Sequence, residues 1–316
     1  MKKRTGLGLL GLALAGGTAA GMSALRRQLY HRAMTAIPRN PRYDEVEPRI
    51  HREGRDWARR GVGFRTMTIR STDGLTLSAK AIPASGECHR WAICVHGYAD
   101  THTGMGAYAL RYHREGWNVL MPDQRGYGDS EGTYMGWGYL ERLDLVGWIS
   151  LLLRRDPQAE ILLHGVSMGA VTVLMAIGGP LPKQVKCAVS DCAFTSMEQE
   201  LHHVLTRRRS TTGKGVELPA GLAIPTLRRA VLHRDGFDIR DASALKAVEQ
   251  STTPTLFIHG GQDLLVPPVM MERLYEAAAC PKSRLWVPQA EHATALGTDP
   301  VRYWAAVDRF LRRYFK

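Results

Sequence analysis

The stretch Ile161-Leu162-Leu163-His164-Gly165-Val166-Ser167-Met168-Gly169-Ala170 carries the strongest structural signal in the chain. Its apolar start predicts a buried strand, its end opens a helical stretch, and G-x-S-x-G lies at the turn between them. The two glycines permit a tight, strained turn that presents the Ser167 hydroxyl above a sheet. The amino terminus of the following helix favours negative charge that develops there. We therefore predict that Ser167 is a nucleophile.

Short apolar runs alternate with helical stretches on both sides of this turn, after an opening hairpin around Asp73-Gly74. Strands that are apolar on both faces predict a mostly parallel sheet covered by helices on both sides. The expected strands are 64–70, 75–82, 91–96, 117–121, 161–164, 185–190, 255–259 and 285–287, with helices near 105–114, 140–155, 168–178, 268–279 and 300–315.

We divide the chain into three parts on this pattern. Residues 1–32 form an N-terminal membrane anchor or signal segment, and residues 33–62, rich in proline and arginine, form a linker with a short helix. Residues 63–316 form the main domain. Within it, residues 195–250 interrupt the rhythm of strand and helix before the next strand, which predicts a helical cap above the carboxyl edge of the sheet.

A nucleophilic serine needs a base to take its proton and an acid to orient that base. Asp263 follows one predicted strand and His292 follows the next, in the order serine, acid, histidine that this architecture uses. Both loops lie at the carboxyl ends of parallel strands, where such sheets place their active sites. We predict Asp263 as the acid and His292 as the base, with Asp191 and Glu291 as the alternative acids.

Backbone N–H groups should hold the oxyanion of the reaction intermediate. We expect one donor to be the amide after the serine, Met168, and the other to be Tyr98, in the loop after an earlier strand. The glycine-rich loop 123–130 lacks the Lys-Ser/Thr ending of a phosphate loop, so we interpret it as part of the pocket rim. His164 and His259 are expected to be core residues at strand ends.

From about residue 63 onward the chain resembles the α/β-hydrolases, and it is similar to a bacterial, membrane-attached branch related to prolyl-aminopeptidase-like and monoglyceride-lipase-like serine hydrolases. The matching motifs, in family order, are His96-Gly97-Tyr98, Asp123-Gln124-Arg125-Gly126-Tyr127-Gly128, Gly165-Val166-Ser167-Met168-Gly169, His259-Gly260-Gly261-Gln262-Asp263 followed by Val266-Pro267, and Glu291-His292.

The resemblance implies an α/β-hydrolase fold with a mostly parallel, eight-stranded sheet and a helical cap inserted before the strand that carries the acid. It also implies a Ser167–His292–Asp263 mechanism through an acyl-enzyme, without metal or organic cofactor. Members of the family cleave carboxylic esters, thioesters, lipids or small amides, so the resemblance leaves the substrate open.

The net charge of +12 is concentrated at one end of the chain. Residues 1–60 contain 13 Lys and Arg against 5 Asp and Glu, whereas the remaining 256 residues contain 29 against 25. This pattern favours a membrane flank over a nucleic-acid groove, and no nucleic-acid-binding motif is present. The five cysteines are scattered, and three lie in or beside apolar runs, which predicts buried free thiols rather than a disulfide framework.

Residues 5–24 are uncharged and follow Lys2-Lys3-Arg4. Twenty such residues just reach the length of a membrane-spanning helix, although six glycines dilute the leucines. The basic start and the small residues near Thr18-Ala19-Ala20 also fit a cleavable signal peptide, so anchor and secretion signal both stay open. Retention of the basic start inside the cell would place the main domain on the outer side.

Three functions are compatible with these features. The first is hydrolysis of carboxylic esters of small or lipid-like alcohols. The second is amide hydrolysis by an aminopeptidase, for which Glu198, Glu200 and Glu217 of the cap offer carboxylates to bind a substrate amine. The third is a non-catalytic, membrane-attached binding protein on the same scaffold. Arg207-Arg208-Arg209 in the cap is interpreted as a solvated charged segment, with anionic substrates or lipid headgroups as the alternative.

Overall fold

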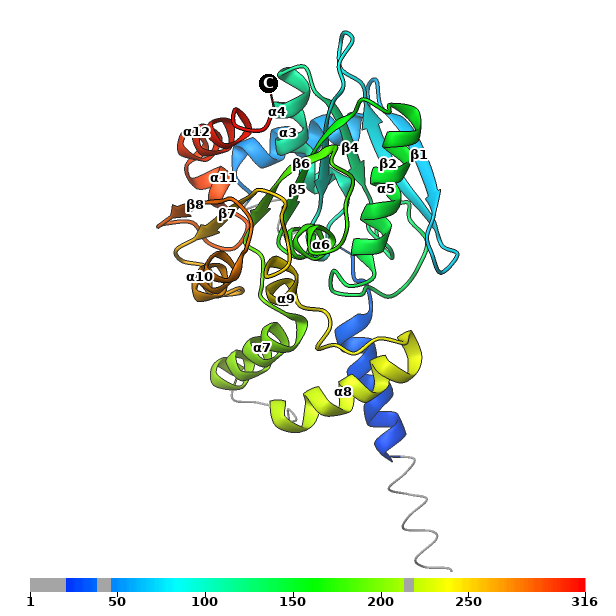
Figure 1. The fold of residues 1–316 in the computed structure, drawn as a ribbon. Helices are drawn as coiled ribbons and strands as arrows, with labels where there is room; N and C mark the ends of the chain where they lie inside the picture. The colour runs from blue at the N-terminus through cyan, green and yellow to red at the C-terminus, as the bar shows by residue number, and fades with distance from the viewer. Residues whose placement is uncertain (1–20, 39–46, 213–218, 316) are drawn as a thin grey trace, which may run out of the picture. The chain divides into compact units, whose positions relative to one another are not determined.

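The computed structural model describes residues 21–38, 47–212 and 219–315 (Figure 1). A helix over residues 21–34 comes first. The elements that follow are α3 (Arg49–Arg60), β1 (Arg65–Arg70), β2 (Thr76–Ile82), β3 (Arg90–Val95), η1 (His102–Met105), α4 (Gly106–Arg114), β4 (Asn118–Pro122), α5 (Glu141–Arg155), β5 (Glu160–Val166), α6 (Met168–Ile177), β6 (Val185–Asp191), α7 (Met197–Thr212), α8 (Ala220–Asp235), α9 (Ala244–Val248), β7 (Thr255–Gly260), α10 (Pro268–Ala277), β8 (Lys282–Val287), α11 (Ala295–Thr298) and α12 (Pro300–Leu311).

The eight strands form one sheet in the order β1-β2-β4-β3-β5-β6-β7-β8. Strand β2 pairs antiparallel with both β1 and β4, and the other neighbours pair in parallel. The hairpin expected around Asp73-Gly74 joins β1 to β2, with Arg70 opposite Thr76. The predicted α/β-hydrolase fold is therefore confirmed. The parallel order also brings the carboxyl ends of β5, β6, β7 and β8 together at one edge.

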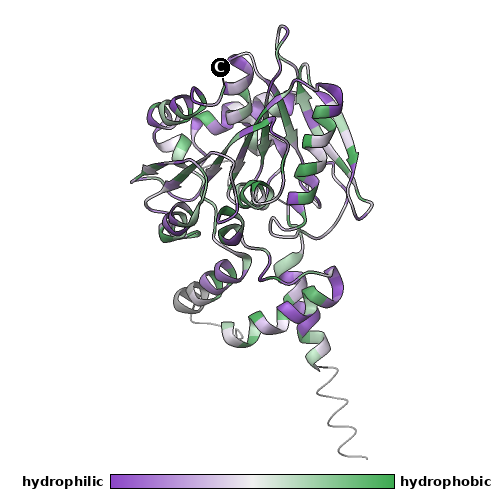
Figure 2. Cartoon of the chain, in the orientation of Figure 1, coloured by the Kyte–Doolittle hydropathy of each residue, from purple (hydrophilic) through white to green (hydrophobic). Residues whose placement is uncertain are grey.

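Helices cover both faces of the sheet because its inner strands are apolar on both sides. Every residue of β4 and β7 is buried, and so is every residue of α6. Side chains of α3, α4, α11 and α12 join one core cluster with the strands, while α5 and α9 pack with α6 on the other face. Figure 2 shows the central strands and α6 as largely hydrophobic. All five cysteines are free thiols, and Cys88 alone among them is half-buried rather than buried.

The chain divides into two compact units. The sheet unit comprises Ala36–Glu200 and Arg240–Lys316, and the helical unit comprises Met1–Thr35 and Leu201–Ile239. Within the helical unit the Tyr30 hydroxyl donates to Asp235 Oδ1 at 2.7 Å, and the Arg234 guanidinium lies 4.6 Å from the centre of the Tyr30 ring. The helix over residues 21–34 thus packs against α8.

The predicted N-terminal anchor or signal segment falls mostly on residues 1–20, which lie outside the described residues. Within the described ranges, no helix combines the length and the apolar character that a membrane crossing requires. The short helix expected in residues 33–62 is α3, whose inner face is buried.

Candidate active site

Ser167 occupies a strained turn between β5 and α6. Its backbone has φ of 54° and ψ of −121°, a conformation that non-glycine residues rarely adopt. The flanking glycines are required by close packing: a Cβ atom at Gly165 would lie 2.3 Å from the Gly169 carbonyl oxygen, and one at Gly169 would lie 2.1 Å from the Val95 carbonyl oxygen. The turn therefore holds the serine at the carboxyl edge of the sheet.

The structure brings the predicted base against the predicted nucleophile. His292, in the loop after β8, has its Nε2 atom 2.8 Å from Ser167 Oγ. Its Nδ1 atom lies 2.8 Å from Asp263 Oδ2. A carboxylate only accepts hydrogen bonds, so Nδ1 carries the proton and Nε2 is left to accept from the serine hydroxyl. This is the tautomer that a general base needs.

Asp263 is held rigidly in the loop after β7. Its Oδ1 atom accepts from the N–H of Val266 at 2.8 Å and from the N–H of Leu265 at 3.0 Å. Burial alone would raise the pKa of this carboxyl, but hydrogen bonds from His259 and His292 outweigh burial and hold the pKa well below its ordinary value. Asp263 is therefore an anion that orients His292 and stabilises positive charge on its ring.

His259 belongs to this arrangement although the sequence indicated only a core residue. It is fully buried in β7, and its Nε2 lies 2.9 Å from the Val266 carbonyl oxygen and 3.3 Å from Asp263 Oδ2. Because a carbonyl oxygen only accepts hydrogen bonds, Nε2 carries a proton. The Asp263 carboxylate also accepts from this N–H. No sequence signal separates such a residue from other strand-end histidines.

The two amides expected to form an oxyanion hole belong to segments that lie next to Ser167. Met168 is the first residue of α6, so its N–H has no carbonyl partner within the helix. The loop with Tyr98 also reaches the nucleophile, since a Cβ atom at Gly97 would lie 3.2 Å from Ser167 Cβ. His96 fixes that loop because its Nε2 accepts from the Gln124 N–H at 2.9 Å.

Asp191, the alternative acid, ends β6 beside Asp263 but makes different contacts. Its Oδ2 accepts from the Tyr303 hydroxyl at 3.0 Å, and its Oδ1 has no hydrogen-bond partner among the described residues. Burial raises the pKa of Asp191 to about 6, while the Tyr303 bond and the nearby histidines lower it. Asp191 is therefore hydrogen-bonded to Tyr303 and not to His292.

The Tyr303 hydroxyl is one step in a buried hydrogen-bond chain that ends at Asp191. His164 Nε2 lies 3.1 Å from the Tyr303 hydroxyl, and His164 Nδ1 lies 2.8 Å from the Tyr112 hydroxyl. Because Tyr303 donates to the carboxylate, its oxygen accepts from His164 Nε2, and Nδ1 then accepts from Tyr112. Burial lowers the pKa of His164 to about 3, so the ring is neutral.

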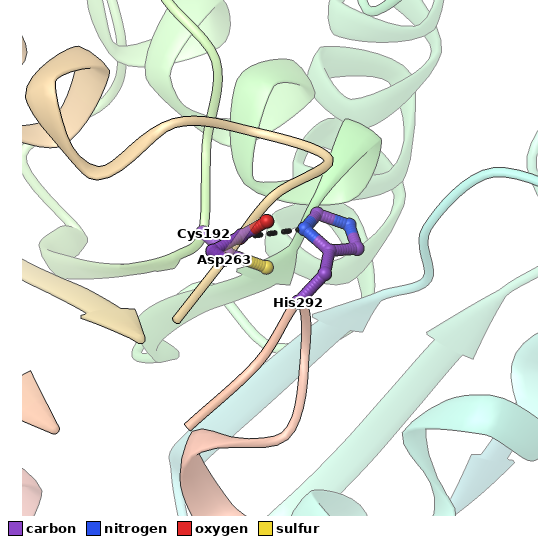
Figure 3. Close-up of side chains that lie close together, drawn as sticks. All are labelled: Cys192, Asp263 and His292. Atoms are coloured by element: carbon purple, nitrogen blue, oxygen red, sulfur yellow. Dashed lines mark hydrogen bonds and ion pairs between the residues drawn. The ribbon is translucent and has the colours of Figure 1, made fainter. Parts of the chain in front are cut away.

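Cys192 adds a thiol to the pair formed by the acid and the base. One donor atom each from Cys192, Asp263 and His292 lies within 4.8 Å of the others, close enough to hold a metal ion (Figure 3). However, burial raises the pKa of the Cys192 thiol well above its ordinary value, and a metal binds the thiolate. His292 Nδ1 is also already bonded to Asp263. The group fits acid–base chemistry better than metal binding.

Backbone strain marks the same edge of the sheet. Ala99, Ser167, Cys192 and Ala293 all have positive φ between 51° and 57°, and each lies in or next to a loop already described. A non-glycine residue in this region costs about 1–3 kcal/mol and persists where the surroundings fix it, often at functional sites. Apart from the serine turn, no sequence pattern indicated these positions.

The remaining candidates among the described residues differ in burial. Glu291, the other alternative acid, is exposed. Glu198 is half-buried in the first turn of α7, and Glu200 in the same turn is buried. Glu217 and the side chains of Arg207-Arg208-Arg209 lie outside the described residues.

Comparisons with known proteins agree with this geometry. A family model described as "Serine aminopeptidase, S33" matches residues 87–224, which include the Tyr98 loop and Ser167. The chain is 31% identical to the uncharacterized protein YqkD of Bacillus subtilis, over 69% of this chain and 70% of that one. It is 26% identical to the uncharacterized protein YfhR of Escherichia coli K12, over 76% and 75% of the two chains.

Solved structures share the fold. The esterase Pf2001 of Pyrococcus furiosus has a TM-score of 0.62 and 24% identity, over 80% of this chain and 93% of that one. The acylaminoacyl peptidase of Pyrococcus horikoshii has a TM-score of 0.58 and 17% identity, over 80% of this chain and 42% of that one. Esterases and peptidases both occur among these neighbours. The family match, together with the 31% identity to YqkD over about two thirds of both chains, shows that the chain belongs to the serine aminopeptidase S33 family of α/β-hydrolases.

Proposed function

We propose that the protein is a serine hydrolase that cleaves carboxylic esters through an acyl-enzyme. The observation that carries this proposal is the continuous hydrogen-bond chain from Ser167 Oγ through His292 to Asp263, with 2.8 Å at both steps. A strained serine whose base is already within hydrogen-bond distance and correctly oriented is the arrangement that nucleophilic acyl transfer requires.

The reaction follows from these contacts. His292 Nε2 takes the Ser167 hydroxyl proton as Oγ attacks the ester carbonyl carbon, and the N–H groups of Tyr98 and Met168 hold the oxyanion. The imidazolium then gives its proton to the departing alkoxide, which leaves an ester on Ser167. Water, deprotonated by His292, attacks this acyl group, and the acid departs as Oγ regains its proton. Asp263 stays ionised throughout.

Apolar side chains beside the acid favour ester substrates with apolar groups. Leu264 and Leu265 directly follow Asp263 and are 65% and 45% exposed, and Val269 at the start of α10 is 54% exposed. Tyr98, beside the nucleophile, is 42% exposed. Exposed apolar residues gathered at one loop often mark a binding surface. The esterase among the structural neighbours is consistent with this substrate class.

A fluorophosphonate probe and p-nitrophenyl esters of increasing chain length test the proposal. Ser167→Ala should lose both labelling and turnover, because in the described part of the chain no other hydroxyl is paired with His292. Ser190→Ala is the matched control: Ser190 is also a buried serine at this sheet edge, and its hydroxyl has no partner among the described residues. This variant should keep both. Wild-type protein that neither binds the probe nor hydrolyses esters would favour the non-catalytic binding protein instead.

A second candidate, an aminopeptidase, is favoured by Glu200. Its carboxyl is 3% exposed, and its Oε2 has no hydrogen-bond partner within the described ranges. Burial, together with the charge of nearby Asp263, raises the pKa of Glu200 to about 8. A buried carboxyl near the triad that lacks a cationic partner is suited to hold the protonated α-amine of a substrate.

Paired substrates separate the two candidates. An aminopeptidase should cleave an aminoacyl p-nitroanilide and reject its N-acetylated form, and Glu200→Gln should weaken that preference by about 10- to 100-fold, as expected for a lost charged hydrogen bond. Glu198→Gln is the control, because Glu198 lies two residues before Glu200 in the same turn of α7 and is half-buried. Wild-type protein that cleaves p-nitrophenyl esters but neither anilide would leave the esterase as the only candidate.

We also propose that the chain is attached to a membrane by its N-terminal segment, with the sheet unit on the outer side. A relative from Saccharomyces cerevisiae, 24% identical over 80% of this chain and 81% of its own, is described as an uncharacterized membrane protein. In the helical unit, Met22, Leu222 and Leu232 are 46%, 60% and 49% exposed, as expected beside a lipid surface. Recovery of the full chain in the soluble fraction at low salt would contradict the attachment.

A further inference from the structure

Helix α3 carries a buried arginine that contacts the loop following β3. The Arg55 side chain is only 4% exposed. Its Nη1 donates to Asp100 Oδ1 at 2.8 Å and its Nη2 donates to Asp100 Oδ2 at 3.0 Å, which makes a two-pronged pair. The same guanidinium donates to Glu47 Oε1 at 2.9 Å and to Thr103 Oγ1 at 3.1 Å. Such bidentate pairs fix geometry as well as charge.

Asp100 lies two residues after Tyr98, whose N–H is the proposed second oxyanion donor. Its Oδ1 also accepts from the Thr101 N–H at 2.8 Å, so the carboxylate fixes the backbone of its own loop. Ala99, between the two residues, has φ of 55°. A strained residue of this kind keeps its conformation only when its neighbours are held. The ion pair between Arg55 and Asp100 therefore also constrains the backbone next to Tyr98.

Helix α3 is itself locked in place. A Cβ atom at Gly54, next to Arg55, would lie 2.1 Å from the Ala107 backbone nitrogen, and one at Gly106 would lie 2.1 Å from the Gly54 carbonyl oxygen. The backbones of α3 and α4 thus touch at this point. Arg55 therefore belongs to a helix whose position is fixed by this backbone contact.

The other end of the loop is fixed by a second carboxylate. Asp123, fully buried after β4, accepts from the His102 N–H at 2.7 Å, and its Oδ2 accepts from the Asp129 N–H at 3.1 Å. Burial would raise the pKa of Asp123, but its bond with His102 holds the pKa below its ordinary value. The segment from Tyr98 to His102 therefore has an anchor at Asp100 and another at Asp123.

We infer that Arg55 is a positioning residue for the oxyanion hole: through Asp100 it fixes the loop whose Tyr98 N–H holds the developing negative charge. This inference rests on the proposed serine-hydrolase function. Oxyanion stabilisation depends on donors held at about 2.7–3.1 Å from the transition-state oxygen, so a loosened loop costs rate rather than binding. Helix α3, which precedes residue 63, thus helps to hold the loop that carries the Tyr98 N–H.

The test replaces Arg55 by lysine, which keeps the charge but loses the planar fork. Arg111→Lys is the control. Arg111 of α4 also pairs with two carboxylates, Glu115 and, at 3.2 Å, Asp308. Asp308 belongs to α12, and Glu115 follows the end of α4. Asp100→Asn, an isosteric change on the loop side of the pair, is the second variant.

Each variant is assayed with a p-nitrophenyl ester and with an alkyl trifluoromethyl ketone, whose hemiketal oxyanion occupies the oxyanion hole. Arg55→Lys and Asp100→Asn should lower kcat by about 10- to 100-fold, change KM by less than about threefold, and weaken ketone inhibition as much as they lower kcat. Arg111→Lys should change kcat and ketone inhibition by less than about threefold per folded molecule, even where its Tm falls.

Equal losses of kcat in Arg55→Lys and Arg111→Lys, or unchanged ketone inhibition in both Arg55→Lys and Asp100→Asn, would overturn the inference. Neither result touches the proposed function, because that function depends on Ser167→Ala losing turnover in the same assay. Turnover that survives in Ser167→Ala would instead remove the function on which the inference rests.

Discussion

Two neighbouring strands of the sheet, β6 and β7, lead to buried aspartates, and the two carboxyl groups behave in opposite ways. Asp191 and Asp263 are 0% and 2% exposed. The pKa of Asp191 is raised to about 6, mainly by burial, whereas hydrogen bonds hold the pKa of Asp263 below its ordinary value in spite of burial. Similar burial therefore accompanies a raised pKa in one carboxyl and a lowered pKa in the other.

The difference lies in the donors around each carboxyl. Asp263 accepts from two backbone N–H groups and faces His259 and His292. Asp191 accepts from one tyrosine hydroxyl, and one of its oxygens has no partner among the described residues. Donors to the charged form lower a pKa, and burial without enough of them raises it. An aspartate at a strand end can therefore serve as the triad acid when the following loop supplies hydrogen-bond donors to its carboxylate.

The largest effect expected from this comparison is on turnover. Asp263→Asn should lower kcat by about 10⁴-fold, because the amide no longer holds His292 in the tautomer that accepts the serine proton. Asp191→Asn should change kcat by less than about threefold, since Tyr303 rather than His292 is its partner. Ester hydrolysis measured on purified, folded variants decides this. A large loss in Asp191→Asn and a small one in Asp263→Asn would exchange the roles of the two carboxyl groups.

The next effect is on the pH dependence of stability. A carboxyl whose folded pKa is about 6, against an ordinary value of 3.8, makes the folded state less stable as pH rises between these values. Asp191→Asn removes that loss, so its Tm relative to wild type should rise from pH 4 to pH 6 and then stay level.

Asp263 should show the opposite sign. Because its pKa is lowered, its ionised form stabilises the folded state above the ordinary value, and this stability disappears as pH falls through the folded pKa. Asp263→Asn should therefore have a lower Tm than wild type at pH 6, with a smaller deficit at low pH. Thermal unfolding curves of both variants from pH 2 to pH 8 provide the measurement, because the Asp263 effect falls below pH 4, and parallel curves for the two would refute the assignment.

The smallest effect concerns the hydrogen-bond chain behind Asp191. Tyr303→Phe keeps the ring and removes the hydroxyl that donates to Asp191. The free energy of unfolding should fall by about 2 kcal/mol above pH 6, where the carboxylate needs this donor. Turnover should stay within about threefold of wild type. Urea unfolding at pH 5 and pH 8 measures the first quantity, and a loss of the same size at both pH values would argue against the role of the charge.

The sequence predicted those parts of the site that depend on local pattern. The turn at Ser167 needs only residues on either side of it, and Asp263 and His292 each follow a recognisable strand. What remained open was which aspartate serves as the acid. Its partners come from far along the chain: His292 is 29 residues from Asp263, and Tyr303 is 112 residues from Asp191. Only the packed sheet brings those donors to one strand end or the other.

Contacts between side chains from distant segments left no local signal. The sequence indicated residues 33–62 as a linker with a short helix, and nothing in it marked Arg55 among the many arginines there. The contact of His259 with Asp263 and the strained backbone at Cys192 depend in the same way on packing between loops. The fold could be predicted from the sequence because hydrophobic periodicity repeats along the chain. Each of these contacts occurs only once, so no repeated pattern indicates it.

The proposed mechanism requires an acyl group to form on Ser167, so the most direct measurement is the mass of the acylated protein. A p-nitrophenyl ester mixed with enzyme and quenched in acid within the first turnover should give a burst of about one p-nitrophenol per chain. Intact and peptide mass spectrometry should then place one acyl group on Ser167, and Ser167→Ala should show neither burst nor adduct. Turnover by wild-type protein with no adduct, or with the acyl group on Cys192, would contradict the account.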